Sequence, residues 1–376
     1  MNVHSKPVSA PQKHISWWRT GVGEEEVSNV VESIRAEHIS GGPVTEQLEA
    51  AIGDTLGVPF VVCTTSGSMA LTLALMTLGV GPGDEVIVPN RTFMATAHAA
   101  LMLGAAVRLV DVLPDIPVLD VSQVEAAITP ATKAIMPVHL NGRAVDMAAL
   151  NAIAKRHGVA VVEDAAQAML SKGPDGWLGT QSDLGCFSLG MTKLLSTGQG
   201  GFVVTSNQTL YTRMRRVQNH GVVDTLKDSY EFVGSNFKFN DVLASIGLAQ
   251  LERGPAKVAH VTKIYKTYKT AVDELDFIDI VPVNVDQRET PLWTEVVCAD
   301  RAARAQLMEF LAGRGIDTRQ FLPDLDLSTY LNNTGDFPYS RKFGNGGLFL
   351  PGGPTQPMEN VHATIDALRE YASQHV

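Results

Sequence analysis

The chain has 376 residues, 45% hydrophobic and 19% charged, so it is long enough for one large domain and a smaller one. Its 30 basic and 40 acidic residues give a formal net charge of −10, which argues against a general nucleic-acid-binding protein. The longest apolar helix candidate, "MALTLALMTLGV" (residues 69–80), is shorter than the roughly 20 residues that span a bilayer, so no membrane association is expected.

The three cysteines, Cys63, Cys186 and Cys298, are far apart and form no Cys-x-x-Cys pair. They therefore predict neither a disulfide framework nor a zinc site, and no histidine spacing typical of a metal site is present. The first 18 residues lack the apolar core of a signal peptide. Together these features favour a cytoplasmic protein without a bound metal.

Residues 1–24 are expected to form an irregular amino-terminal arm. The segment "GEEEVSNVVESIRAEHIS" (residues 23–40) then predicts an amphipathic helix that ends at the turn Ser40–Pro43. Short apolar segments alternate with helical ones as far as residue 205, and seven of them are expected to be strands: residues 60–63, 85–89, 106–112, 134–138, 159–164, 185–189 and 201–205. This pattern predicts an α/β fold with a mostly parallel seven-stranded sheet between helices.

A long helical segment, residues 239–275, is interrupted at Gly254–Pro255 and is expected to carry the chain into a second domain. Shorter elements follow, including "TEVVCAD" and "RAQLMEFLAGRG". The predicted division is an arm over residues 1–24, a large domain over residues 25–255 and a smaller carboxyl-terminal α+β domain over residues 256–376.

Small polar residues follow the first predicted strand, and ligands in an open α/β sheet bind beyond the carboxyl ends of its strands. Gly67 and Ser68, in "TTSGS", precede a helix, so backbone N–H groups there could hold a phosphate. The same sequence is also typical of a serine or threonine that only caps the helix. Ser188 ends another predicted strand, where its hydroxyl could complete the phosphate site or cap a turn.

Asp164 ends the predicted strand 159–164, where an aspartate is costly unless it is paired. It could cap a following helix or direct its carboxylate at a cationic ring nitrogen. Gln167 lies about one helical turn later and could point into the same space. Phe93, in "VPNRTFMAT", offers a flat apolar surface after a further strand, either in the core or beneath a cofactor.

Lys193 lies among small, polar and flexible residues in "CFSLGMTKLLSTGQGG" (Cys186–Gly201). It could lie on a solvated turn, or at the mouth of a pocket where partial desolvation makes it an amine nucleophile. Taken together, an amine, a carboxylate, a phosphate loop and an aromatic face are what pyridoxal 5′-phosphate (PLP) requires. Its aldehyde needs an amine, and its ring is an electron sink while the nitrogen is protonated.

From about residue 25 to its end the chain resembles the sugar aminotransferases of the DegT/StrS type, which are fold type I PLP-dependent enzymes. The resemblance is carried by blocks in that family's order, such as "VVEDAAQA" and "NFKFNDVLASIGLAQLER": residues 39–58, 66–99, 128–147, 161–168, 185–205, 236–253 and 348–361. It implies that Lys193 forms an imine with PLP and that Asp164 pairs with the ring nitrogen. It further implies that Gln167 lies near the ring oxygen, Phe93 stacks on the ring, and Gly67, Ser68 and Ser188 hold the phosphate.

The resemblance also implies a homodimer with shared active sites, because Asn236 would reach the phosphate of the partner subunit. Lys193 stands where some relatives have histidine and deoxygenate, so transamination is expected. The donor is expected to be L-glutamate, with glutamine as an alternative, and the acceptor a keto sugar nucleotide in amino-sugar biosynthesis. The alternatives are a free keto-cyclitol or keto sugar as acceptor, or a catalytically idle PLP-binding regulatory protein.

Some residues depart from the family's pattern or carry no assignment. Asn141 replaces a tyrosine in "HLNG", Arg91 stands where the family is often apolar or aromatic, and "LGMTK" lacks the more usual residues before the lysine, so the acceptor's identity is open. Lys238 stands where the family often has arginine, which keeps a cation but not the bidentate geometry. His139 is expected to be structural. Arg143 is expected either to bind an anion or to form a surface salt bridge, as is Arg319. Trp17 and Trp18 are expected to anchor the arm, either against the body of the chain or against a partner subunit.

Overall fold

The computed structural model describes residues 14–224, 226–331 and 335–375. Its central sheet has the strand order β1-β9-β8-β5-β4-β2-β3. The strands are β1 (Phe60–Thr64), β2 (Glu85–Pro89), β3 (Ala106–Val110), β4 (Thr132–Ile135), β5 (Ala160–Asp164), β8 (Leu184–Ser188) and β9 (Gly201–Thr205). Only β9 runs antiparallel to its neighbours, so the predicted mostly parallel α/β sheet is confirmed.

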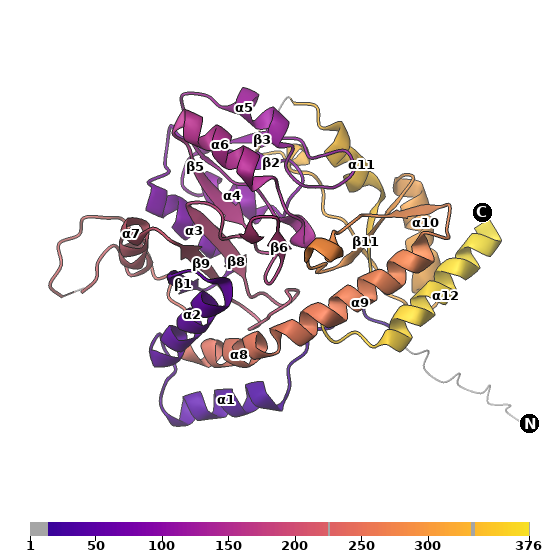
Figure 1. Cartoon of the computed structure of the whole chain (residues 1–376), viewed down its shortest axis with the longest axis horizontal. Helices are drawn as coiled ribbons and strands as arrows, with labels where there is room; N and C mark the ends of the chain where they lie inside the picture. The colour runs from indigo at the N-terminus through magenta and orange to yellow at the C-terminus, as the bar shows by residue number, and fades with distance from the viewer. Residues whose placement is uncertain (1–13, 225, 332–334, 376) are drawn as a thin grey trace, which may run out of the picture.

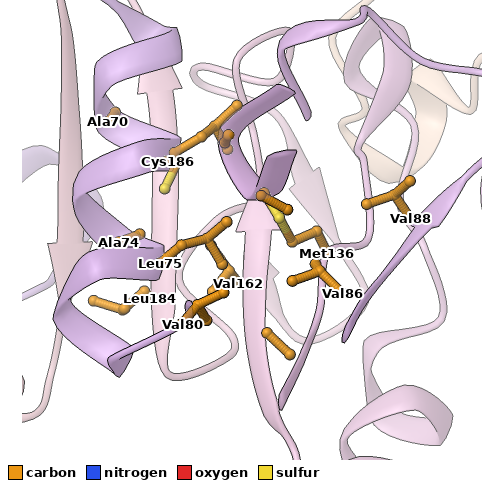
Figure 2. Close-up of a cluster of buried hydrophobic side chains, with 14 of the residues drawn as sticks. Ala70, Ala74, Leu75, Val80, Val86, Val88, Met136, Val162, Leu184 and Cys186 are labelled. Atoms are coloured by element: carbon orange, nitrogen blue, oxygen red, sulfur yellow. The ribbon is translucent and has the colours of Figure 1, made fainter. Parts of the chain in front are cut away.

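Alternate side chains of each strand point to opposite faces of this sheet, and helices pack on both faces and bury them. Val86 and Val88 of β2 pack with α3 (Gly67–Leu78) and α4 (Ala95–Leu101) in one core cluster (Figure 2). Ile87 faces the other way and packs against α6 (Met147–His157). Apolar side chains on both faces explain why these strands read as continuous apolar runs.

A second sheet lies beyond residue 275, with the order β10-β11-β13-β12 and antiparallel pairing throughout. Its strands are β10 (Ile278–Ile280), β11 (Thr294–Cys298), β12 (Arg319–Gln320) and β13 (Gly347–Leu350). The predicted helix break is present, because α8 (Asp241–Glu252) ends just before α9 (Gly254–Val272), with Pro255 in the first turn of α9. The domain boundary near residue 255 stays a prediction.

Most of the remaining helices cover the two sheets or connect their strands, whereas α1 packs on α8, and α9 runs beside α12 (Figure 1). The remaining helices are α1 (Glu24–Arg35), α2 (Pro43–Leu56), α5 (Val124–Ala127), α7 (Gln208–Gln218), α10 (Arg301–Ala312), α11 (Pro338–Gly346) and α12 (Met358–His375). Short 3-10 turns are Val121–Gln123, Leu140–Gly142, Val285–Gln287 and Leu325–Leu327, and β6 (Lys172–Gly173) pairs with β7 (Gly176–Trp177) in a hairpin that the sequence did not predict. Within the described residues, no helix combines the length and apolarity needed to cross a membrane.

Two expectations at the amino terminus need correction. The predicted helix ends at Arg35, and Pro43 begins α2 instead of closing a turn, because its fixed φ suits the first position of a helix. Residues 1–13 of the predicted arm lie outside the described residues. The rest of the arm packs on its own chain: Ile15 bridges to Ile316, and Trp18 bridges to Gly352.

Candidate active site

A cavity of about 280 Å³ lies at the carboxyl ends of β1, β2, β5 and β8, where loops of the large sheet meet the second sheet. Of the predicted site residues it brings together Gly67, Ser68, Phe93, Asp164, Gln167, Ser188 and Lys193. The second sheet contributes Glu295, Arg319 and Phe349 to the same wall. Residues that follow different strands and lie far apart in the sequence therefore line one cavity.

The amino-terminal end of α3 forms one side of the cavity. Ser66 caps this helix, since its hydroxyl oxygen accepts a hydrogen bond from the Met69 amide at 3.2 Å, which leaves Ser68 free of the capping role. A Cβ atom on Gly67 would lie 2.7 Å from the Ser188 Cβ, so only glycine allows this close approach. The N–H groups of the first helical turn thus open next to two serine hydroxyls.

Asp164 is buried, and its carboxylate is held in place from two sides. One oxygen accepts the Thr96 hydroxyl at 2.7 Å and the other accepts the Ala166 amide at 3.1 Å. Burial raises the pKa of Asp164, while these hydrogen bonds and the charge of Lys193 act in the opposite direction. Turns instead of a helix follow Asp164, so the capping interpretation is wrong.

Lys193 lies in the loop between β8 and β9, with its ammonium 5.5 Å from the centre of the Trp293 ring. Burial lowers the pKa of Lys193 from 10.5 to about 8, and the nearby Asp164 carboxylate limits the drop. The interpretation of a lysine on a solvated turn is therefore wrong. A lysine with this pKa is partly neutral at physiological pH, as an amine nucleophile must be.

The lowered pKa of Lys193 makes a prediction about pH. With a pKa of about 8, about one lysine in ten is neutral at pH 7, against fewer than about one in a thousand at 10.5. The rate at which cofactor-free protein captures PLP covalently, followed by borohydride trapping, should rise with pH and level off above about pH 8. A rate that keeps rising to pH 10 would contradict the lowered pKa. Lys193→Ala, which lacks this amine, is the negative control for covalent capture.

Gln167 lines the cavity but not through helical spacing, because it lies in a turn. Its amide oxygen accepts the Asn141 backbone N–H at 2.9 Å. Asn141 has a left-handed φ of 55°, and its side chain bonds both backbone groups of Trp293, at 2.7 and 3.0 Å. The asparagine that departs from the family's pattern thus fixes the position of the tryptophan beside Lys193.

The predictions for Phe93 and Asn236 have different outcomes. Phe93 is 46% exposed and lines the cavity, so the alternative of a core phenylalanine is wrong. Asn236 is exposed and does not line the cavity of its own chain, and it lies two residues from Lys238, whose ammonium donates to Asn219 at 3.0 Å. The contribution of Asn236 to a partner's site remains a proposal.

The other polar candidates are mostly structural. His139 is buried and hydrogen-bonds Glu163 at 2.9 Å, as expected for a structural histidine. Arg143 is also buried and forms an ion pair with Glu295 at 2.6 Å, so both earlier expectations for it, an anion site or a surface salt bridge, are wrong. Arg319 lines the cavity with its guanidinium 5.0 Å from the Trp17 ring centre. Among the described residues no cluster of side chains could hold a metal ion.

The buried pair of Arg143 and Glu295 predicts a large stability effect. Arg143→Met leaves the Glu295 carboxylate buried without its partner, which should reduce the free energy of unfolding by about 3–5 kcal/mol. The measurement is the midpoint and slope of urea unfolding. Arg143→Met/Glu295→Gln removes both charges and should recover part of the loss. An unchanged midpoint in the single variant would show that the pair contributes nothing.

The family model described as "DegT/DnrJ/EryC1/StrS aminotransferase family" matches residues 21–369. GDP-perosamine synthase of Caulobacter vibrioides is 40% identical over 214 residues, which are 57% of this chain and 58% of that protein. The chain thus matches less than two thirds of the length of this curated relative.

Solved structures agree with the family match. The structure of S. venezuelae DesV in complex with a ketimine intermediate is 32% identical and has a TM-score of 0.90, covering 96% of this chain and 99% of that one. Spr1654 of Streptococcus pneumoniae, a putative sugar aminotransferase solved in its PLP form, is 26% identical with a TM-score of 0.90, covering 96% of this chain and all of its own. The chain therefore belongs to the DegT/DnrJ/EryC1/StrS aminotransferase family, which confirms the predicted family, the fold of PLP-dependent aminotransferases and PLP as the cofactor.

Proposed function

We propose that this chain is a transaminase that moves an amino group from L-glutamate to a keto sugar nucleotide in amino-sugar biosynthesis. One observation carries the proposal: Lys193, Asp164 and the amino-terminal end of α3 with Ser188 line a single cavity of about 280 Å³. Each group matches one part of PLP, and the name of one relative, GDP-perosamine synthase, supports the class of product.

The residues present fit PLP. Glycine at position 67 lets the first turn of α3 lie against Ser188, so the N–H groups of that turn and the Ser188 hydroxyl are close enough to hold one phosphate. Asp164 is a buried carboxylate with only neutral hydrogen-bond donors, so a cationic ring nitrogen is the partner that its environment lacks. Phe93 presents an exposed aromatic face to the same space.

When bound, PLP supplies an electrophilic carbon and a ring that takes up electrons. Asp164 would keep a proton on the ring nitrogen, because its own charge is otherwise unpaired in a buried site. Lys193, once released from the cofactor, would use its neutral amine to take and return the substrate proton. Trp293 and Phe349 of the second-sheet wall would exclude water from that transfer.

Recognition of the substrates is proposed for the other side of the cavity. Arg319 lines it, and within the described residues its guanidinium forms no ion pair, only the contact with Trp17. An arginine in that state fits an anionic group, either the carboxylate of the donor or the diphosphate of the acceptor.

We also propose that the active unit is a homodimer. Val27, Val31 and Ile34 form an exposed apolar stripe on α1, and the segment after α7, which extends away from the body (Figure 1), exposes Leu226 and Val233. If Asn236 reaches the partner's phosphate, mixing inactive Lys193→Ala and Asn236→Ala chains should restore activity, because one site of each hybrid dimer is intact. Restoration would fail if Asn236 acted only within its own chain.

The test separates the two half-reactions. L-Glutamate added to the yellow holoenzyme should bleach its absorbance, and a panel of keto sugar nucleotides should restore it and yield amine products by mass spectrometry. If L-glutamate bleaches the holoenzyme but only free keto sugars or keto-cyclitols are aminated, one of these is the acceptor instead of a keto sugar nucleotide. A holoenzyme that neither L-glutamate nor L-glutamine bleaches would favour the idle PLP-binding protein.

A further inference from the structure

Arg91 is a buried arginine in the wall of the cavity. It follows β2 in the same loop as Phe93, is 6% exposed and lines the space that the substrates must enter. Burying a guanidinium there is costly unless the structure pairs it, so its contacts show what it is held for.

The anchoring of Arg91 comes from the segment that follows β12. Its Nη1 donates to Asp324 Oδ1 at 2.7 Å and to the Leu322 carbonyl at 2.8 Å. Its central carbon lies 4.9 Å from the centre of the Phe321 ring. One nitrogen therefore makes both hydrogen bonds, and they fix the plane and direction of the guanidinium.

The edge of the guanidinium formed by Nε and Nη2 makes no hydrogen bond to the described residues. Nε is too deeply buried for a ligand in the cavity to reach it. Nη2 is not buried to that extent, so it is the donor of Arg91 that remains for a ligand.

Charge decides which kind of group this donor fits. Asp324 balances the charge of Arg91, and Arg341 in turn lies 3.6 Å from Asp324 and 2.5 Å from Asp326. Arg91 and Arg341 are thus paired with two aspartates, and Arg304, whose pKa burial lowers, lies close enough for the charge of Arg91 to contribute to that drop. Arg319, by contrast, is the lining arginine without a carboxylate partner among the described residues. An anion gains more from Arg319, which leaves Arg91 for an uncharged oxygen.

We propose that Arg91 determines specificity in the acceptor half-reaction by donating from its Nη2 to a hydroxyl oxygen of the keto sugar. This proposal rests on the proposed function. L-Glutamate has no hydroxyl group, so its half-reaction does not use this donor. A site that hydrogen-bonds a substrate hydroxyl also discriminates strongly against analogues that lack it.

The experiment compares Arg91→Met with Arg91→Lys and the wild type. The probe is the keto sugar nucleotide with the highest wild-type turnover in the acceptor panel, together with its analogues that each lack one ring hydroxyl. Arg91→Met should lower kcat/KM for the parent acceptor by about 10- to 100-fold, while bleaching by L-glutamate reports folding and cofactor loading. Arg91→Lys keeps the charge beside Asp324 but lacks the planar guanidinium, so it should recover only part of the loss in kcat/KM.

One deoxy analogue identifies the bonded hydroxyl. The wild type should lose about as much on that analogue as Arg91→Met loses on the parent, and Arg91→Met should not distinguish the two acceptors. If Arg91→Met folds poorly, Arg91→Met/Asp324→Asn removes both buried charges and gives the same comparison. Unchanged acceptor kinetics, or a loss confined to the L-glutamate half-reaction, would overturn the role of Arg91 alone. A wild type that aminates no keto sugar nucleotide would overturn the proposed function.

Discussion

Lys193→Ala is expected to reduce transamination by at least about 10³-fold while the protein still folds. General acid–base transfer by a positioned side chain is worth about 10²–10⁴-fold, and this variant also loses the amine that captures the cofactor. No other lysine lines the cavity, so no neighbouring amine can take over within the described residues. The measurement is single-turnover bleaching of PLP-loaded protein by L-glutamate, with circular dichroism to confirm the fold.

Lys172→Ala is a matched control, because Lys172 also lies over a tryptophan, 4.0 Å from the Trp177 ring centre, yet lies outside the cavity. It should leave the half-reaction unchanged within about 3-fold, as expected for a substitution away from the reacting groups. Methylamine, a small amine that fits the vacated space, should recover part of the Lys193→Ala activity. Full activity of Lys193→Ala without added amine would exclude the proposed role.

The sequence predicted the half of the site that depends on local patterns. Apolar strands alternate with helices over residues 60–205, and the polar residues that end β1, β2, β5 and β8 meet at one edge for that reason alone. Lys193 and Asp164 were found this way. Gln167 was placed in the right space by the wrong spacing, because a turn, not a helix, follows Asp164.

The opposite wall could not be predicted in this way. Trp293 immediately precedes β11 and Glu295 lies within it, and their approach to Lys193 depends on contacts between segments more than 100 residues apart. Asn141 holds Trp293, but nothing in the letters "HLNG" indicates that partner. Thr96 was missed as well, although it lies only three residues after Phe93. Its hydroxyl reaches Asp164 because α4 turns back over the end of the sheet.

Asp164→Asn is expected to lower transamination by about 10²- to 10³-fold, because an uncharged amide cannot hold a proton on the ring nitrogen. The substitution keeps the size of the side chain, and its amide can still bond Thr96 and Ala166. Stability should move in the other direction. Burial raises the pKa of Asp164, so folding disfavours its anionic form at pH 7, and cofactor-free Asp164→Asn should unfold at an equal or higher temperature.

These two measurements together distinguish a functional carboxylate from a structural one. A structural carboxylate would lose stability and activity in parallel, whereas a carboxylate kept for the cofactor costs the cofactor-free protein free energy of folding. Thr96→Val is the intermediate variant: it keeps the charge but removes one of the two hydrogen bonds, and should lower activity less than Asp164→Asn does. A cofactor-free Asp164→Asn protein that is markedly less stable yet active within about 3-fold would show that Asp164 serves the fold, and the ring nitrogen would need another partner.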